Sequence, residues 1–149
     1  MWKTVVAIAV SASVMGGLVG GLVGMAQSPA RSVWDGAFTD AQALRGMEAY
    51  DVSCASCHQA DLSGGVLVGD DEAPALRNVD RLAARKDLDA LFSFVKNGMP
   101  ADSPSSLTDA TYIDIVAYIL QQNAFPAGRS ELKADPGTLK TIAIVRTRP

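Results

Sequence analysis

Three residues with thiol or metal-binding chemistry stand together in this sequence: Cys54, Cys57 and His58. No other cysteine or histidine occurs in the chain, which excludes a four-ligand zinc site built from these residue types. Their spacing is C-x-x-C-H, in which two thiols on one helical turn can form thioethers with the two vinyl groups of a haem. The adjacent histidine can then bind the iron through a ring nitrogen. The motif predicts one haem c, attached through Cys54 and Cys57, with His58 as an iron ligand.

Three alternatives to haem attachment have to be weighed. A redox pair of the thioredoxin type usually opens a helix in a β-α-β unit, but no alternating strand pattern precedes Cys54. A partial metal site needs a fourth ligand, and a disulfide between Cys54 and Cys57 leaves His58 without a role. We therefore favour haem attachment over these alternatives.

The second axial position of the iron needs another ligand, and the chain has no second histidine. Of its five methionines, three belong to the apolar N-terminal segment and Met47 belongs to the apolar stripe of an expected helix. Met99 remains, between Gly98 and Pro100, in a loop with a restricted backbone. The alternative is a loop methionine that only covers the core. We favour Met99 as the ligand opposite His58.

The N-terminal segment carries no charge between Lys3 and Arg31, and it consists mostly of Val, Ala, Leu and Gly. Residues 1–26 are therefore expected to be a signal peptide or an N-terminal transmembrane anchor. Gly24 and Ala26 have the small side chains that a signal peptidase site requires. In both cases the rest of the chain is expected in the periplasm or at the periplasmic face of a membrane.

If it is not cleaved, this segment also supplies membrane contact through residues 4–26, as an apolar helix. Its glycines recur at spacings that let a second membrane helix approach closely. One hypothesis is thus an interaction subunit that assembles a membrane complex through Gly20 and Gly21. The formal charge of −3 and the pI near 5.0 argue against nucleic acid as a partner.

Three main helices are expected in the exported part. The first should begin at the capping-box pattern from Thr39 to Gln42 and end before the cysteines. The second should extend from the N-cap Asp87 to Asn97, with Gly98 as its stop signal. The third should open at Thr108 and be largely buried, because its apolar face is wide. The residues expected on the apolar stripe of the first helix are Ala43, Leu44, Met47 and Tyr50.

These elements suggest an organisation of the whole chain. Residues 27–38 are expected to be a linker, residues 39–126 a haem domain and residues 127–149 a tail that packs on that domain. The stretch 59–78 is expected to be a loop, because it is rich in Gly and acidic residues. The apolar residues expected to line a haem pocket are Leu76, Leu82, Leu91, Phe92, Val95 and Ile115.

From residue 39 to residue 122 the chain resembles the class I monohaem cytochromes c. Gly46 and Tyr50 precede Cys54 at the spacing of the glycine and the aromatic residue on that family's N-terminal helix, and Tyr118 lies where the family places an aromatic partner. A residue without Cβ lets two helices cross closely, and aromatic rings can lock the crossing. The resemblance implies an all-α cytochrome c fold, with three main helices and loops around one covalent haem.

The same resemblance extends to two loops. The segment 97–100 resembles the family's ligand loop, which implies iron binding by Met99. The segment 72–76 resembles the stretch whose proline carbonyl accepts the second N–H of the proximal histidine, which implies that Pro74 orients His58. A narrower likeness, to cytochrome c domains that partner periplasmic dehydrogenases or respiratory and photosynthetic complexes, is carried by HQADLSGG, EAPAL and YIDIVAYILQQNAFPAG.

A haem with His58 and Met99 as axial ligands has no open position for a substrate, which leaves one-electron transfer between Fe(III) and Fe(II). The expected function is therefore electron transport between redox protein partners, without enzymatic activity, by a carrier tethered to a membrane or belonging to a larger redox complex. The alternative is a haem peroxidase or gas sensor in which Met99 leaves the iron.

Overall fold

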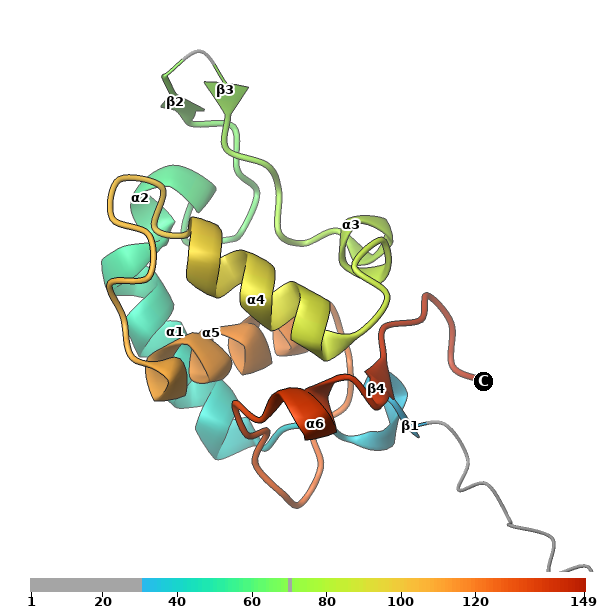
Figure 1. Cartoon of the computed structure of the whole chain (residues 1–149). Coiled ribbons are helices and arrows are strands. Elements are labelled where there is room, and N and C mark those ends of the chain that lie inside the picture. Colours follow the sequence, from blue (N-terminus) through green and yellow to red (C-terminus); the bar gives the residue numbers. More distant parts are fainter. Residues whose placement is uncertain (1–30, 70) are drawn as a thin grey trace, which may run out of the picture.

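The computed structural model of the protein describes residues 31–69 and 71–149, and this part of the chain is mostly helical (Figure 1). The three longest helices are α1, α4 and α5, as the sequence predicts. The apolar helix expected in residues 1–26 lies outside the described residues. The elements in chain order are β1 (Arg31–Ser32), η1 (Val33–Asp35), α1 (Asp40–Ser53), α2 (Ala55–His58), β2 (Leu67–Val68), β3 (Asp71–Glu72), α3 (Val79–Ala83), α4 (Leu88–Gly98), α5 (Asp109–Gln122), α6 (Pro136–Leu139) and β4 (Ile142–Ala143).

Two short sheets supplement the all-α architecture. β1 pairs with β4 in parallel, and β2 pairs with β3 as an antiparallel arm that projects from the helical body in Figure 1. The segment 59–78, expected to be a loop throughout, therefore contains two strands. In the described part of the chain, no helix has the length and apolar character needed to cross a membrane.

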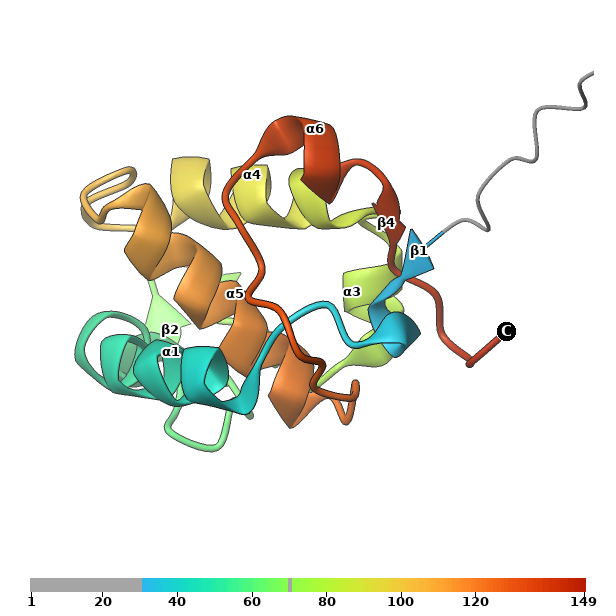
Figure 2. The same ribbon diagram turned by 90° about the horizontal axis from the view of Figure 1, so that it is seen from below.

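Residues 31–38 are a folded part of the molecule, which corrects the expectation that they belong to a linker. β1 and β4 lie side by side in Figure 2. The side chains of Val33 and Phe38 are completely buried, and the indole Nε1 of Trp34 donates a hydrogen bond to the carbonyl of Val145 at 3.0 Å. The C-terminal residues thus hold the start of the described chain. The buried residues of the tail are Leu132, Leu139, Ile142 and Ile144.

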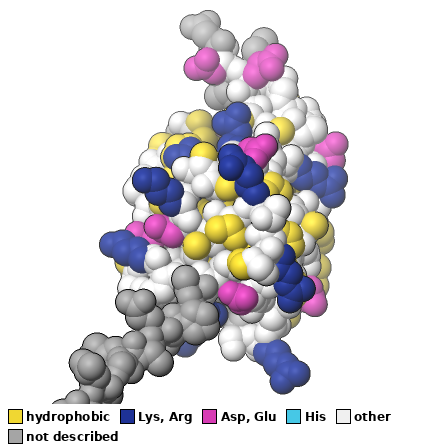
Figure 3. All heavy atoms as spheres, turned by 90° about the vertical axis from the view of Figure 1, so that its right-hand side faces the viewer, with side chains coloured by type: hydrophobic (Ala, Val, Ile, Leu, Met, Phe, Trp, Pro, Cys, Tyr) yellow, Lys and Arg dark blue, Asp and Glu magenta, His cyan; other side chains and the backbone are white. Residues whose placement is uncertain are grey.

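The surface on the side of α3 and β4 is electrostatically mixed. Figure 3 shows Lys and Arg side chains spread over this face, with Asp, Glu and hydrophobic side chains between them. Two oppositely charged residues of these segments form an ion pair, namely Arg146 of the tail and Asp80 of α3. This face therefore carries no single patch of positive charge.

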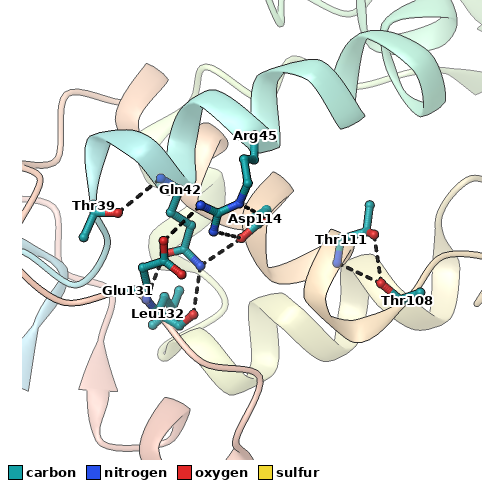
Figure 4. Close-up of polar contacts among 8 residues, drawn as sticks. All are labelled: Thr39, Gln42, Arg45, Thr108, Thr111, Asp114, Glu131 and Leu132. Carbon is teal, nitrogen blue, oxygen red and sulfur yellow. Dashed lines mark hydrogen bonds and ion pairs between the residues drawn. The ribbon is translucent and has the colours of Figure 1, made fainter.

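The three main helices begin at their predicted N-caps. In each case the side-chain oxygen of the cap accepts a hydrogen bond, at 2.9 to 3.1 Å, from the backbone N–H three residues later. Figure 4 shows two of these bonds. The caps are Thr39 of α1, Asp87 of α4 and Thr108 of α5.

The capping box predicted at the start of α1 is incomplete, because the side chain of Gln42 takes no part in it. Its side chain does not return to the backbone of Thr39 but is buried, at 1% exposure, where α1 meets the tail. The amide Nε2 donates to the carbonyl of Leu132 at 2.8 Å and to Asp114 at 3.0 Å, and the amide oxygen accepts from the Leu132 N–H at 2.8 Å (Figure 4). Gln42 therefore connects three segments of the chain.

The crossing of α1 and α5 depends on Gly46. A Cβ atom at this position would lie 1.9 Å from the backbone oxygen of Asp114, so only glycine permits this approach. Next to the crossing, the rings of Tyr50 and Tyr118 lie 5.3 Å apart. Leu44 was predicted on the apolar stripe of this helix but is 55% exposed. The face of α1 that crosses α5 is formed by Gly46 and by residues three or four positions away from it, and Leu44 is not one of these.

α5 is the most buried helix, as its wide apolar face predicts. It packs against α1 and α4, so residues around most of its circumference are covered. Its buried side chains are Tyr112, Ile113, Ile115, Val116, Ala117, Tyr118, Ile119 and Leu120.

Candidate functional site

The C-x-x-C-H motif forms a turn at the junction of α1 and α2. The N–H of Cys54 donates to the carbonyl of Tyr50 at 2.8 Å and ends α1, and the carbonyl of Cys54 accepts from the N–H of His58 at 2.9 Å. Cys54 itself has a non-helical backbone, which separates the two helices. His58 is buried, and both cysteines are partly buried and free. Both thiols are therefore available for covalent attachment of a cofactor.

Burial raises the pKa of the Cys54 thiol to about 11, and the neighbouring Cys57 adds to the effect. Redox-active pairs of the thioredoxin type instead need a thiol whose pKa is lowered, because the thiolate is the nucleophile. The environment of Cys54 therefore argues against a dithiol redox centre.

Pro74 lies against His58 as the sequence resemblance implies. The imidazole Nδ1 is 2.9 Å from the carbonyl oxygen of Pro74. Because a carbonyl only accepts hydrogen bonds, this contact assigns the proton to Nδ1 and leaves the lone pair of Nε2 available to a metal. The ring is thus held in the tautomer that a proximal ligand requires.

Gly64 brings the two sides of this contact together, and it is not among the site residues predicted from the sequence. Its N–H donates to the carbonyl of His58 at 2.9 Å, and its φ of +67° is in the left-handed region. A Cβ atom here would lie 2.4 Å from the oxygen of Ala73 and 2.6 Å from the carbonyl carbon of Pro74. The Gly64-Gly65 pair was the available signal, because adjacent glycines in a loop often mark such close approaches.

Met99 follows the last residue of α4 and has an extended backbone, with φ −128° and ψ 150°. The helix ends here because the residue before a proline disfavours helical geometry, so Pro100 supplies the stop. Gly98 belongs to α4, which corrects its predicted role as the residue beyond the helix end.

Tyr112 fixes the backbone of Met99. Its hydroxyl donates to the carbonyl of Met99 at 2.7 Å and accepts from the N–H of Leu107 at 3.4 Å. Tyr112 belongs to the wide apolar face of α5, which by itself indicates only burial. Its hydroxyl is a polar atom on a buried face and needs a partner, which was the signal for this role.

One cavity of about 840 Å³ brings together all five predicted site residues. Its size is within the range of cofactor and small-molecule sites, about 300 to 1,000 Å³. Five of the six expected apolar wall residues line it, and Phe92 does not, because it is buried in the core on another side of α4. Phe94 lines the cavity instead. The predicted site residues in the wall are Cys54, Cys57, His58, Pro74 and Met99.

The donor set of this cavity fits a haem. It offers two thiols, an imidazole with a free Nε2 and a thioether, within walls that are mainly apolar. Within residues 31–69 and 71–149, no group of three or more His, Cys, Asp or Glu side chains could hold a bare metal ion. The two thiols, the imidazole and the thioether are the groups that attach and ligate an iron carried by a macrocycle.

Comparison with known proteins identifies a family whose model covers the whole site. Residues 41–119, more than half of the chain, match the family model described as "Cytochrome C oxidase, cbb3-type, subunit III". The matched range contains the motif at 54–58, Pro74 and Met99. No curated protein and no solved structure matches the chain.

Proposed function

Because this chain belongs to the family described as cytochrome c oxidase, cbb3-type, subunit III, we propose that it is a one-electron carrier with His58 and Met99 as the axial ligands of its haem. The family domain is a monohaem c-type cytochrome, and haem c is attached through the C-x-x-C-H motif. When bound, the haem supplies an Fe(III)/Fe(II) couple.

The observation that carries this proposal is the shared cavity of His58 and Met99. His58 is fixed by the carbonyl of Pro74, and Met99 is fixed at its backbone by Tyr112, so both donors come from positioned segments. A thioether ligand favours Fe(II) and raises the reduction potential above that of a bis-histidine site. The apolar walls act in the same direction, because they disfavour the more charged oxidised state.

The alternative of a peroxidase or gas sensor requires an open axial position. The chain has no second histidine that could act as a distal acid or base beside such a position. The hydrogen bond from Tyr112 to the carbonyl of Met99 also opposes movement of the ligand loop. These two features favour electron transfer without enzymatic activity.

The cellular setting is part of the same proposal. The uncharged apolar stretch before Arg31 supports export, and it supports a carrier at the periplasmic face of a membrane, tethered by residues 4–26 or assembled in a larger redox complex. The family description supports redox proteins of a respiratory complex as its electron donor and acceptor.

The intact mass and absorption spectrum of the purified full chain test the proposal. The chain should be produced in a host that attaches haem c and exports proteins. We expect the mass of the polypeptide plus one haem, in which both cysteines are blocked, and the mass also reports whether residues 1–26 are removed. A mass equal to that of the polypeptide alone, with no visible absorption, would overturn the proposal.

A further inference from the structure

Two arginine side chains line the cavity at the α3 side of the molecule. Arg81 belongs to α3, and Arg85 follows that helix in a turn closed by a 3.0 Å hydrogen bond from its N–H to the carbonyl of Leu82. Figure 1 shows α3 and α2 on opposite sides of the molecule. Arg81 and Arg85 therefore line the cavity from the α3 side, whereas Cys54 and Cys57 line it beside α2.

This arrangement matches the asymmetry of a haem. Its two vinyl groups and its two propionates lie on opposite edges of the macrocycle. Attachment of the vinyl edge to Cys54 and Cys57 would direct the propionate edge toward α3. Carboxylates beside an apolar cavity need hydrogen-bond donors or positive charge, and a guanidinium supplies both.

The two guanidinium groups are available for this role. Among the described residues, neither Arg81 nor Arg85 forms an ion pair, and no other Lys or Arg lines the cavity. The guanidinium of Arg85 stacks over the ring of Phe94, 3.5 Å from its centre, and this cation–π contact holds it at the cavity wall. The carboxylates in the wall, Asp71, Glu72 and Asp102, would repel a propionate.

We propose that Arg81 and Arg85 bind the two haem propionates and thereby raise the reduction potential of the iron. This inference rests on the proposed function, since it requires the haem in this cavity. A fixed positive charge near the macrocycle stabilises Fe(II) relative to Fe(III), because the reduced site carries one positive charge fewer.

The test compares the holoproteins of R81Q and R85Q with wild type by spectroelectrochemistry. Each variant should lower the ratio of reduced to oxidised haem at a fixed ambient potential by about two- to five-fold, the scale of one exposed ion pair. Resonance Raman spectra should show a shifted propionate bending mode in both variants. K86Q is the matched control: Lys86 also carries one positive charge beside Arg85, but it is exposed and does not line the cavity.

The conservative variants R81K and R85K keep the test usable if the glutamine variants fail to fold, because they retain the positive charge. They should keep most of the potential while the Raman mode shifts, since lysine lacks the planar fork of arginine. If R81Q and R85Q bind haem covalently but show the potential and the Raman mode of wild type, this inference is wrong while the proposed function stands. If wild type carries no covalent haem, the proposed function itself fails.

Discussion

The contact between His58 and Pro74 depends on a residue that touches neither the imidazole nor the cavity. Gly64 allows the turn after His58 to press against the backbone of Ala73 and Pro74, and any side chain would push these segments apart. Gly65 is the natural comparison, because it also has a positive φ, of +87°, but a Cβ atom there would meet nothing within 4 Å.

Gly64→Ala is therefore expected to destabilise the holoprotein and to loosen the histidine contact. Both alanine variants incur the backbone penalty of a positive φ, about 1 kcal/mol. Only Gly64→Ala adds the steric conflict with Ala73 and Pro74, and we expect a further loss of roughly 1–3 kcal/mol. Denaturant unfolding monitored at the haem band measures both values. Equal losses in Gly64→Ala and Gly65→Ala would show that the close approach has no energetic importance.

The hydroxyl of Tyr112 should determine how firmly Met99 stays in place. Tyr112→Phe removes a partly buried hydrogen bond to the Met99 carbonyl and should cost about 1 kcal/mol of stability. The reduced variant should also bind carbon monoxide faster than wild type, because the ligand loop opens more easily. Stopped-flow mixing measures the rate. Tyr118→Phe on the same helix is the control, and an equal rate in both variants would exclude a special role for Tyr112.

At the level of elements, the helices were predictable because their signals are local. Thr39, Asp87 and Thr108 each mark a helix start through one side-chain hydrogen bond, and the apolar spacing of α5 already indicates burial on nearly all sides. The strands β1 and β4 were not predictable, because two residues give no periodicity and their partners lie far apart in the sequence.

Gln42 shows a second reason why some features of the helices could not be predicted from the sequence. Its position three residues after Thr39 fits a capping box, but a buried amide between α1 and the tail satisfies more hydrogen-bonding groups than a return to the cap. The tertiary contact with Leu132 determined its role, and nothing in the local sequence reports that contact.

Gln42→Ala should release the tail from α1 without changing the haem. The substitution leaves the N–H and the carbonyl of Leu132 without their side-chain partner, which should cost about 2–4 kcal/mol. Hydrogen exchange should therefore quicken at Leu132, while the absorption spectrum stays the same. Gln121→Ala removes an exposed hydrogen bond to Asp40 and should have little effect. Unchanged protection at Leu132 would refute this account of Gln42.

For the whole molecule, the tail connects the start of the described chain to the helices that surround the cavity. β4 pairs with β1, the N–H of Ile144 donates to the carbonyl of Lys86 at 2.8 Å, and Arg146 pairs with Asp80 of α3. Residues just after the expected membrane segment are thus part of the folded body.

Ile142→Ala tests the contribution of the tail to global stability. Its side chain is 1% exposed, and its truncation should cost about 2–5 kcal/mol through lost burial and the cavity left behind. Thermal unfolding of the holoprotein should shift down by several degrees, while the reduction potential remains that of wild type. Arg148→Ala changes an exposed residue of the same tail and should leave the transition in place. A normal transition in Ile142→Ala would mean that the tail is not part of the cooperative unit.

The five predicted site residues line one cavity, and in the sequence a pentapeptide and two short loops carry them, whereas no comparable motif marks the residues that support them. Gly64 and Tyr112 act through backbone contacts that only the folded chain creates. The reason is physical. The residue types in the sequence already identify the donor atoms, but the orientation of these atoms depends on packing between segments that are far apart in the sequence.

The central claim is that His58 and Met99 hold the iron from its two axial positions. Proton NMR of the reduced holoprotein tests it most directly, because the methyl group of an iron-bound methionine lies in the ring current of the haem and resonates far upfield. The account predicts one such methyl signal in wild type, its retention in Met47→Leu and its loss in Met99→Leu. A covalent haem protein without this signal, or one that keeps it in Met99→Leu, would contradict the account.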